Sequence, residues 1–289
     1  MSAAAATTIE LRPGGLWLAL SENKLAWIGL VLLVLLIGVA ISAPWIAPYD
    51  PLEQNIIVRL EPPSAEFWLG TDSYGRDVLS RLLYGARISL FVGFVAILIA
   101  MLIGTAIGVL AGYVGGVFDQ LVMGVLDVLL AFPTLLLGLM IAAMLGASLE
   151  NLIIAIAVTE VAPFARVARA PTIVLRQREF VEASRSYGCG PLRIMVRHIL
   201  PNMISDVVVM SSLWLASAIR TEASLSFIGL GVPPPAATWG GMIREGFENI
   251  LDAWWLAVFP SLAILITVLA LNLLGDALRD ASDPKSRAR

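Results

Sequence analysis

The chain has 289 residues, of which 58% are hydrophobic and 14% are charged, with a formal net charge of -3. So much apolar side chain exceeds what a water-soluble core of this size can bury, and the composition predicts a polytopic membrane protein. A single cysteine excludes an intrachain disulfide and any site built from several thiolates. The lysines, Lys24 and Lys285, do not follow a glycine, so the glycine-rich loop that binds ATP phosphates is absent. With one histidine, His198, a His-Glu-x-x-His zinc site is excluded as well, and we expect neither a metal site nor catalytic residues.

Six apolar segments are long enough to cross a hydrocarbon core of roughly 30 Å. The predicted spans are residues 25–43, 88–111, 121–145, 152–167, 203–219 and 254–274. The first span is longer than the apolar region of a typical signal peptide, which favours a retained helix over a cleaved leader. The predicted fold class is therefore all-α, with six transmembrane helices.

The segments between the spans complete the predicted organisation. Residues 1–24 form an N-terminal segment, and residues 25–87 contain the first span and a proline-rich loop that ends in an interfacial helix. Residues 88–276 form a five-helix core, and 277–289 a polar tail. In the second span, Gly104, Gly108 and Gly112 recur every four residues. Such a stripe lets another helix approach closely, although chance in a glycine-rich helix is an equally good interpretation.

A polar stretch, residues 182–201, interrupts the apolar sequence between the fourth and fifth spans. Gly188 and Gly190 break a helix, and Pro191 suits the first turn of the next helix because its missing N–H would be unpaired there. The pattern predicts a helix, a turn and a short amphipathic helix that docks against a partner surface. Its apolar face is predicted to comprise Leu192, Met195, Val196 and Ile199, while Arg193 and Arg197 share another face.

Arginines indicate the orientation of the chain in the membrane. Seven of them lie in the loop predicted at residues 166–202, and others lie near the two termini, including Arg12 and Arg279. The segments on the opposite side contain fewer. By the positive-inside rule, both termini and the 166–202 loop are predicted to be cytoplasmic.

The loop resembles the signature loop of the membrane subunits of ATP-binding-cassette (ABC) importers, which reads Glu-Ala-Ala, three residues, Gly, nine residues, Ile-x-Leu-Pro. Glu182, Ala183, Gly188, Leu200 and Pro201 match that pattern, whereas Ser184 and His198 depart from it. Further motifs resemble the second permease of dipeptide and oligopeptide systems. They are Leu69-Gly70-Thr71-Asp72, Gly75-Arg76-Asp77, Phe132-Pro133, Glu222-Ala223-Ser224-Leu225-Ser226-Phe227 and Asn272-Leu273-Leu274-Gly275-Asp276.

The resemblance implies a type I ABC importer permease in a bacterial or archaeal cytoplasmic membrane. The implied partners are a homologous permease, two ATPase subunits, an extracytoplasmic substrate-binding protein and the lipid bilayer, with no nucleic acid. The chain itself is expected to need no cofactor, whereas ATP and Mg would bind the ATPase subunits. Members similar to this chain handle dipeptides, oligopeptides, glutathione or nickel chelates.

The same resemblance implies that the loop docks into a cleft on the ATPase and transmits its motion. The residues implied are Glu182, Ala183, Ser184, Gly188, Arg193, Arg197, His198, Leu200 and Pro201. The alternative is a basic loop that simply faces anionic lipid.

Four charged residues in or near the predicted spans are candidates for the translocation pathway: Asp127, Glu160, Arg220 and Glu222. Unpaired charges in a membrane are costly, so these side chains should face the bundle interior or water. Charge pairing within the bundle is the alternative. A rival function is an ion-driven secondary transporter that uses Asp127 and Glu160 as proton carriers.

Overall fold

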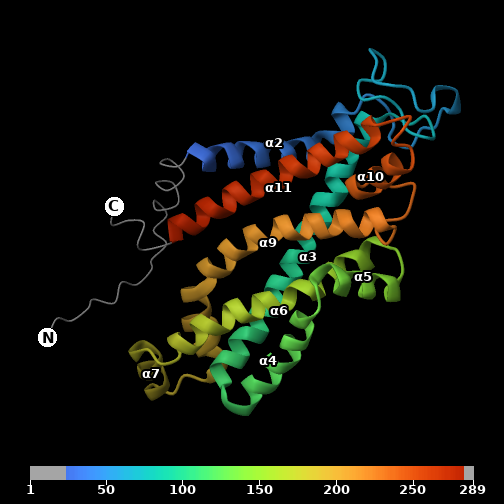
Figure 1. Cartoon of the computed structure of the whole chain (residues 1–289). Helices are drawn as coiled ribbons and strands as arrows, with labels where there is room; N and C mark the ends of the chain where they lie inside the picture. The colour runs from blue at the N-terminus through green and yellow to red at the C-terminus, as the bar shows by residue number, and fades with distance from the viewer. Residues whose placement is uncertain (1–23, 283–289) are drawn as a thin grey trace.

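The computed structural model describes residues 24–282, in which the regular elements are helices that form one elongated bundle (Figure 1). The predicted N-terminal segment up to residue 23, with Arg12, and the tail from 283 lie outside the described residues. The elements, in order, are α2 (Lys24–Ile46), η1 (Ile56–Val58), α3 (Val78–Val114), α4 (Gly116–Ala131), α5 (Thr134–Leu145), α6 (Leu149–Leu175), α7 (Glu179–Ser186), α8 (Pro191–Ile194), η2 (Met195–Ile199), α9 (Leu200–Ile228), α10 (Trp239–Glu248) and α11 (Trp255–Ser282).

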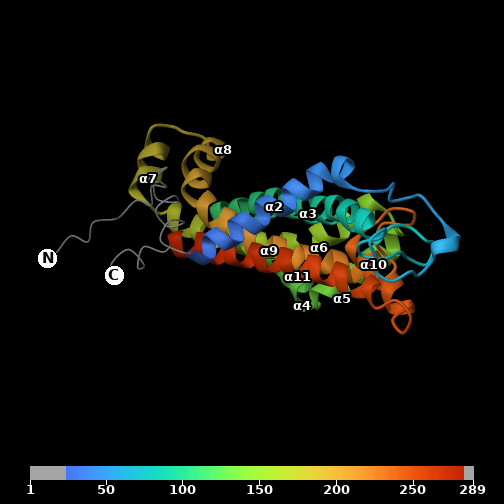
Figure 2. The same ribbon diagram turned by 90° about the horizontal axis from the view of Figure 1, so that it is seen from above.

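The bundle has two different ends, which Figures 1 and 2 show from perpendicular directions. The loop between α2 and α3 and the helix α10 lie at one end. We call this the cap end. The opposite end carries α7 and α8, the start of α2 and the end of α11, and we call it the α7 end.

The six predicted spans are present as five long apolar helices and one broken pair. The broken pair is α4 and α5, which are bent by 93° at Phe132 and Pro133. Pro133 has no N–H and disfavours helical backbone at the preceding residue. Phe132 accordingly adopts extended angles, with φ -83° and ψ 138°, so the predicted third span is not one straight helix.

Three predicted boundaries were wrong. The expected interfacial helix is the first part of α3, which starts at Val78 because the Asp77 side chain caps it by accepting from the Ser80 N–H at 2.7 Å. With 37 residues, α3 is about 55 Å long and extends beyond the hydrocarbon core. Helix α6 continues past Val167 to Leu175, so Arg166 and Arg169 lie in a helix rather than in the loop. Helix α11 continues past the expected boundary at 276.

The glycine stripe of α3 is where α6 packs. A Cβ atom built on Gly104 would lie 2.5 Å from the Val161 carbonyl oxygen, and one on Gly108 would lie 2.2 Å from that of Ala165. At Gly112 the corresponding distance, to the Arg169 oxygen, is 3.0 Å. The two backbones therefore meet where α3 has no side chains, and the prediction of a close helix approach is confirmed.

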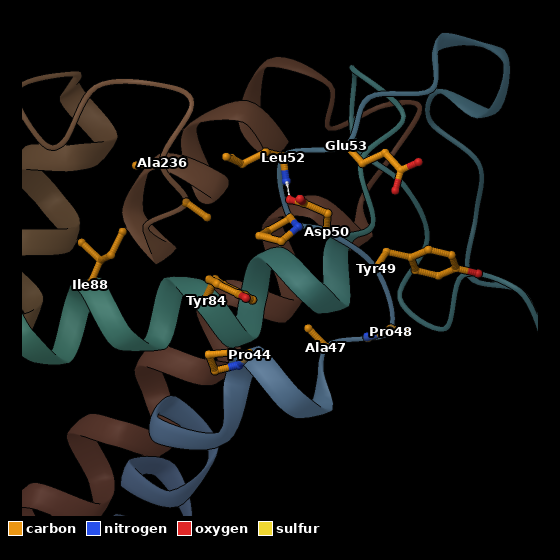
Figure 3. A pocket seen from close by; sticks show the side chains of 12 residues that line it. Pro44, Ala47, Pro48, Tyr49, Asp50, Leu52, Glu53, Tyr84, Ile88 and Ala236 are labelled. Carbon is orange, nitrogen blue, oxygen red and sulfur yellow. Dashed lines mark hydrogen bonds between the residues drawn. The ribbon is translucent and has the colours of Figure 1, made fainter.

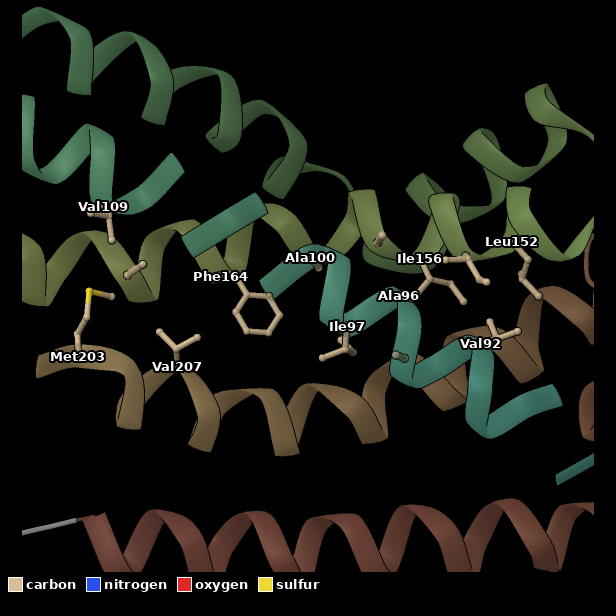
Figure 4. Close-up of a cluster of buried hydrophobic side chains, with 14 of the residues drawn as sticks. Val92, Ala96, Ile97, Ala100, Val109, Leu152, Ile156, Phe164, Met203 and Val207 are labelled. Carbon is tan, nitrogen blue, oxygen red and sulfur yellow. The ribbon is translucent and has the colours of Figure 1, made fainter. Parts of the chain in front are cut away.

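The main apolar core lies between α3, α6 and α9 (Figure 4). Ile97, Ile156, Phe164 and Val207 are buried in it. The ring of Phe164 packs edge-on against Trp214 of α9, with 4.5 Å between the ring centroids. This aromatic pair joins α6 to α9, as the glycine stripe joins α6 to α3.

We predict that Gly108→Ala destabilises the bundle, because even one methyl group would overlap the backbone of α6. Overpacking of this kind costs about 1–3 kcal/mol. Thermal unfolding of the detergent-purified chain measures the effect. The control is Gly124→Ala in α4, where a Cβ meets nothing within 4 Å and alanine is the better helix former. Equal melting temperatures for the two variants would contradict this packing.

Candidate functional site

The segment between α6 and α9 folds as the predicted helix, turn and helix. Helix α7 ends at Ser186, and Gly188 follows with φ +78°, a left-handed conformation that glycine adopts without strain. Pro191 occupies the first turn of α8, as expected. Pro201 likewise lies in the first turn of α9. We call α7, the turn and α8 the coupling segment.

Three buried side chains fix the coupling segment to the bundle. Val181 of α7, Ile194 of α8 and Ile199 at the end of η2 are each 0% exposed and belong to the main core. Cys189, in the turn, packs partly against the same cluster. The segment is thus attached to the core through a few buried side chains.

The predicted apolar face of the second helix is only partly covered by the described part of this chain. Ile199 is buried and Met195 half-buried, but Leu192 and Val196 are 71% and 56% exposed. Residues Met195–Ile199 form a π-helical turn, η2, and Leu192, Met195 and Val196 line one apolar groove beside α3. Val181 and Ile194, which the sequence pattern missed, take the buried positions.

The outer surface of α7 is open. Glu182 and Ala183, from the predicted signature, are exposed, as are Phe180 and Tyr187 at 41% and 89%. The other predicted loop residues fall into two groups. Four are exposed, namely Gly188, Arg193, Arg197 and Pro201, and three are half-buried, namely Ser184, His198 and Leu200. The Ser184 hydroxyl donates to the Phe180 carbonyl at 2.8 Å, within the helix. This surface mixes charged side chains, Glu179, Glu182 and Arg185, with the exposed Phe180 and Tyr187.

Two arginines, one at the end of α6 and one in α7, contact the end of α3. The Arg176 Nη1 donates to the carbonyls of Gly112 and Tyr113, at 2.9 and 3.2 Å, and so satisfies acceptors in the last turn of α3. The Arg185 guanidinium lies 5.3 Å from the centroid of the Tyr113 ring. Of the two arginines, Arg176 lies at the end of α6 and Arg185 in α7, so α7 itself meets α3 at the Tyr113 ring.

Ion pairs also join α4 to α6. Arg169 makes a bidentate pair with Asp119, with both N–O distances at 2.6 Å. Arg166 pairs with Asp127 at 2.6 Å, and both of these side chains are about half exposed. The arginines expected in a loop instead brace two helices.

The four candidate pathway residues do not form one cluster. Asp127 pairs with Arg166, as the charge-pairing alternative expected. Glu160 is 4% exposed, and Glu222 is fully buried with its Oε1 accepting from the Ser226 hydroxyl at 2.8 Å. Arg220 is exposed. Within residues 24–282 no ion pair joins two of the four, and their role in the pathway stays a prediction.

A buried charge network holds the cap end together. Arg76 Nε lies 2.6 Å from Asp72 Oδ2, and Arg81 Nε lies 3.2 Å from the same oxygen. Arg76 also reaches Glu245 of α10 at 3.3 Å, and Glu245 accepts from the Ser73 hydroxyl and N–H. The motifs quoted from the sequence supply the loop residues, whereas no sequence signal identified Glu245.

A cavity of about 670 Å³ opens beside this network, between the end of α2, the start of α3 and the loop before α10 (Figure 3). Tyr49, Tyr84 and Ala236 line it, together with the carboxylates of Asp50 and Glu53. The Asp50 carboxylate already accepts from the Leu52 N–H at 2.8 Å, and Glu53 is exposed. The described residues contain no group of three or more His, Cys, Asp or Glu side chains that could hold a metal ion.

These features define a membrane-spanning helical protein with a short, exposed helix at one end. Comparison with known proteins identifies its family. Residues 104–288 match the model for the binding-protein-dependent transport system inner membrane component, and residues 15–63 match that for the N-terminal transmembrane domain of oligopeptide transport permease C. The chain belongs to this family of ABC importer permeases.

Relatives and solved structures agree with the assignment. The chain is 47% identical over 270 residues to the glutathione transport system permease protein GsiD of Escherichia coli O6:K15:H31, covering 93% of this chain and 89% of the relative. The GsiD protein of Shigella boydii serotype 4 gives the same values. The fold is similar to a chain of the MetNI methionine ABC transporter in an inward-facing conformation, with a TM-score of 0.56, 19% identity, and coverage of 70% of this chain and 96% of that chain.

We predict that Asp72→Ala destabilises the cap end by about 3–5 kcal/mol, because Arg76 and Arg81 would remain buried without their shared partner. Thermal unfolding and proteolysis of the α2–α3 loop in the purified chain measure the loss. Asp252→Ala removes an exposed carboxylate near α10 and serves as the control. Unchanged resistance of the loop in Asp72→Ala would show that the network does not hold it.

Proposed function

We propose that the chain is one of two homologous permeases in an ATP-driven importer, and that its coupling segment docks on a separate ATPase subunit. The observation that carries this proposal is the combination at α7: Glu182 and Ala183 are exposed on the outside, while Val181 of the same helix is fully buried in the core. Such a helix can contact another protein on one face and move the bundle through the other.

The route of the motion follows the contacts described above. A push on α7 reaches α9 through Ile194 and Ile199, and it reaches α3 through Arg176 and Arg185. Closure of the ATPases on ATP would thereby shift the balance between pathway states open to one side or the other. ATP and Mg bind the ATPase subunits in this proposal, and hydrolysis takes place there.

We infer the orientation of the chain in the membrane from the end of the bundle at which exposed arginines are concentrated. Arg178, Arg185, Arg193 and Arg197 are exposed at the α7 end, whereas exposed carboxylates at the cap end include Asp50, Glu53, Glu66 and Asp252. Under the positive-inside rule this distribution supports a cytoplasmic α7 end, with the start of α2 and the end of α11 on the same side. The cap end faces the extracytoplasmic binding protein.

The proposed substrates are short peptides. Support comes from the sequence motifs shared with dipeptide and oligopeptide permeases and from the relative GsiD, whose name states glutathione transport. Dipeptides, oligopeptides and glutathione all carry an ammonium group and a carboxylate, which is why one permease family can serve them.

Coupling is tested with the assembled transporter in proteoliposomes, measuring ATP hydrolysis and uptake of labelled dipeptide and glutathione together. We expect Gly188→Val to retain most of the ATPase activity and to lose roughly tenfold or more in uptake, because valine strains the left-handed turn by about 1–2 kcal/mol or displaces α7. The matched control is Gly190→Val. Both glycines have no atom within 4 Å of a built Cβ, but Gly190 has φ -68°, which valine tolerates.

Normal uptake by Gly188→Val would overturn the role of the turn. The rival function, an ion-driven transporter, predicts uptake that continues with catalytically inactive ATPase subunits and stops when a protonophore is added. Uptake that depends on ATP and resists a protonophore is the result expected for an importer.

A further inference from the structure

The bend between α4 and α5 lies near the middle of the membrane. Leu130, just before the bend, belongs to the same apolar cluster as Ala162 of α6. Gly138, after the bend, faces Thr159 of α6, with 3.7 Å between a built Cβ and the Thr159 side chain. Thr159 and Ala162 lie ten and thirteen residues after the start of α6, or about 15 and 20 Å along a helix of 27 residues. The bend is therefore well inside a hydrocarbon core of roughly 30 Å.

The backbone at this bend is open. Residues 131–136 are all exposed in the described part of the chain. The N–H groups of Thr134, Leu135 and Leu136 form the first turn of α5, where the helix itself offers no acceptor, and no side chain caps them. Within residues 24–282 no backbone carbonyl accepts from them either. Lipid tails cannot form hydrogen bonds, so irregular backbone at this depth occurs only where protein covers it or where it lines a water-filled cavity. The bend therefore does not face lipid.

The exposed surface of α4 is divided into two stripes that run along the helix. One stripe is apolar and comprises Val117, Leu121, Val125 and Val128. The other, which we call the Asp127 stripe, lies about a quarter of a turn away and consists of exposed polar and small residues, Gln120, Gly124, Asp127 and Ala131. It ends at the bend, because Ala131 is the last residue of α4.

A half-exposed ion pair belongs to the Asp127 stripe. The side chains of Asp127 and its partner Arg166 are 55% and 54% exposed. Arg166 lies about 25 Å along α6, still within the thickness of a hydrocarbon core. Charged side chains in a membrane-spanning helix face the bundle interior or a water-filled cavity. Since this pair is not in the interior, it indicates water on the same side of α4 as the open backbone.

We propose that the Asp127 stripe and the bend form one wall of the water-filled pathway through which the substrate crosses the membrane. The inference rests on the proposed function, because a substrate with an ammonium group and a carboxylate needs a polar route through the bilayer centre. Water in the pathway accepts from the free N–H groups of α5 and hydrates the pair of Asp127 and Arg166. Both helices lie along one side of the bundle, where a second permease can supply the opposite wall (Figure 2).

The test measures the access of water to single cysteines in the transporter, assembled with cysteine-free partner subunits in nanodiscs. The chain has one cysteine, so Cys189→Ser is the background for Ala131→Cys and Thr134→Cys, on either side of the bend. The control is Val34→Cys, at a 60% exposed position of α2, a helix whose one charged residue is Lys24. We expect both bend variants to react with a membrane-impermeant methanethiosulfonate roughly tenfold or more faster than the control, because the reactive thiolate is disfavoured in apolar surroundings. The faster reaction is expected in at least one of two states, nucleotide-free or ATP-trapped.

Two results would overturn the wall. Reaction of the bend variants with a lipophilic maleimide alone would show that lipid reaches the bend, and no reaction with either reagent would show that another subunit covers it.

Uptake separates the pathway from other water-filled spaces. After labelling, Thr134→Cys should lose most of its dipeptide uptake, because the adduct occupies the route of the substrate. Unchanged uptake after complete labelling would refute the assignment to the pathway. Failure of the transport proposal shows separately, as absence of ATP-dependent uptake by the unlabelled Cys189→Ser background, and the labelling rates still decide whether the bend faces water.

Discussion

Backbone contact between α3 and α6 is the constraint on which the other contacts of the bundle depend. In a bilayer, lipid tails are as apolar as leucine, so helices gain little from hiding apolar surface from water and associate through close packing instead. Gly104 and Gly108 supply that packing, because the carbonyl oxygens of Val161 and Ala165 occupy the space a side chain would fill. With α6 held there, Phe164 reaches Trp214 of α9, and Arg169 and Arg166 reach the carboxylates of α4.

The same constraint explains how a small exposed helix can act on the whole chain. Interiors packed at this density respond to a push as connected bodies rather than by local deformation. Helix α7 is joined to that interior through Val181, and the end of α3 is joined to the same region through Arg176. The coupling segment therefore reaches the core through Val181 and Ile194, and the end of α3 through Arg185. At the other end, Asp72 and Glu245 hold the cap loop and α10 together through shared arginines, so both ends of the bundle are braced.

Local rules allowed the sequence to predict much of the architecture. Helix breaks at Gly188 and Pro191 follow from backbone chemistry that needs no tertiary information, and the spans follow from hydropathy. The predictions failed where contacts between distant segments, rather than local sequence, determine the structure. The π-helical turn at Met195–Ile199 could not be inferred from a periodicity of 3.6 residues. The pairing of Glu245 with Arg76, 169 positions away, depends on how helices meet in space. The burial of Glu160 and Glu222, by contrast, agrees with the expectation that charges in the spans face the bundle interior or water.

The central claim is that the coupling segment and the end of α3 move as one body when the ATPases close. Spin labels at Ser186 and Val114, both exposed, placed in a Cys189→Ser background, report that relation directly in the assembled transporter. Pulsed electron paramagnetic resonance would measure the distance between the labels without nucleotide and with ATP trapped. The account predicts the same distance distribution in both states, because Arg176 and Arg185 join the two segments. A distribution that shifts on ATP binding would contradict it.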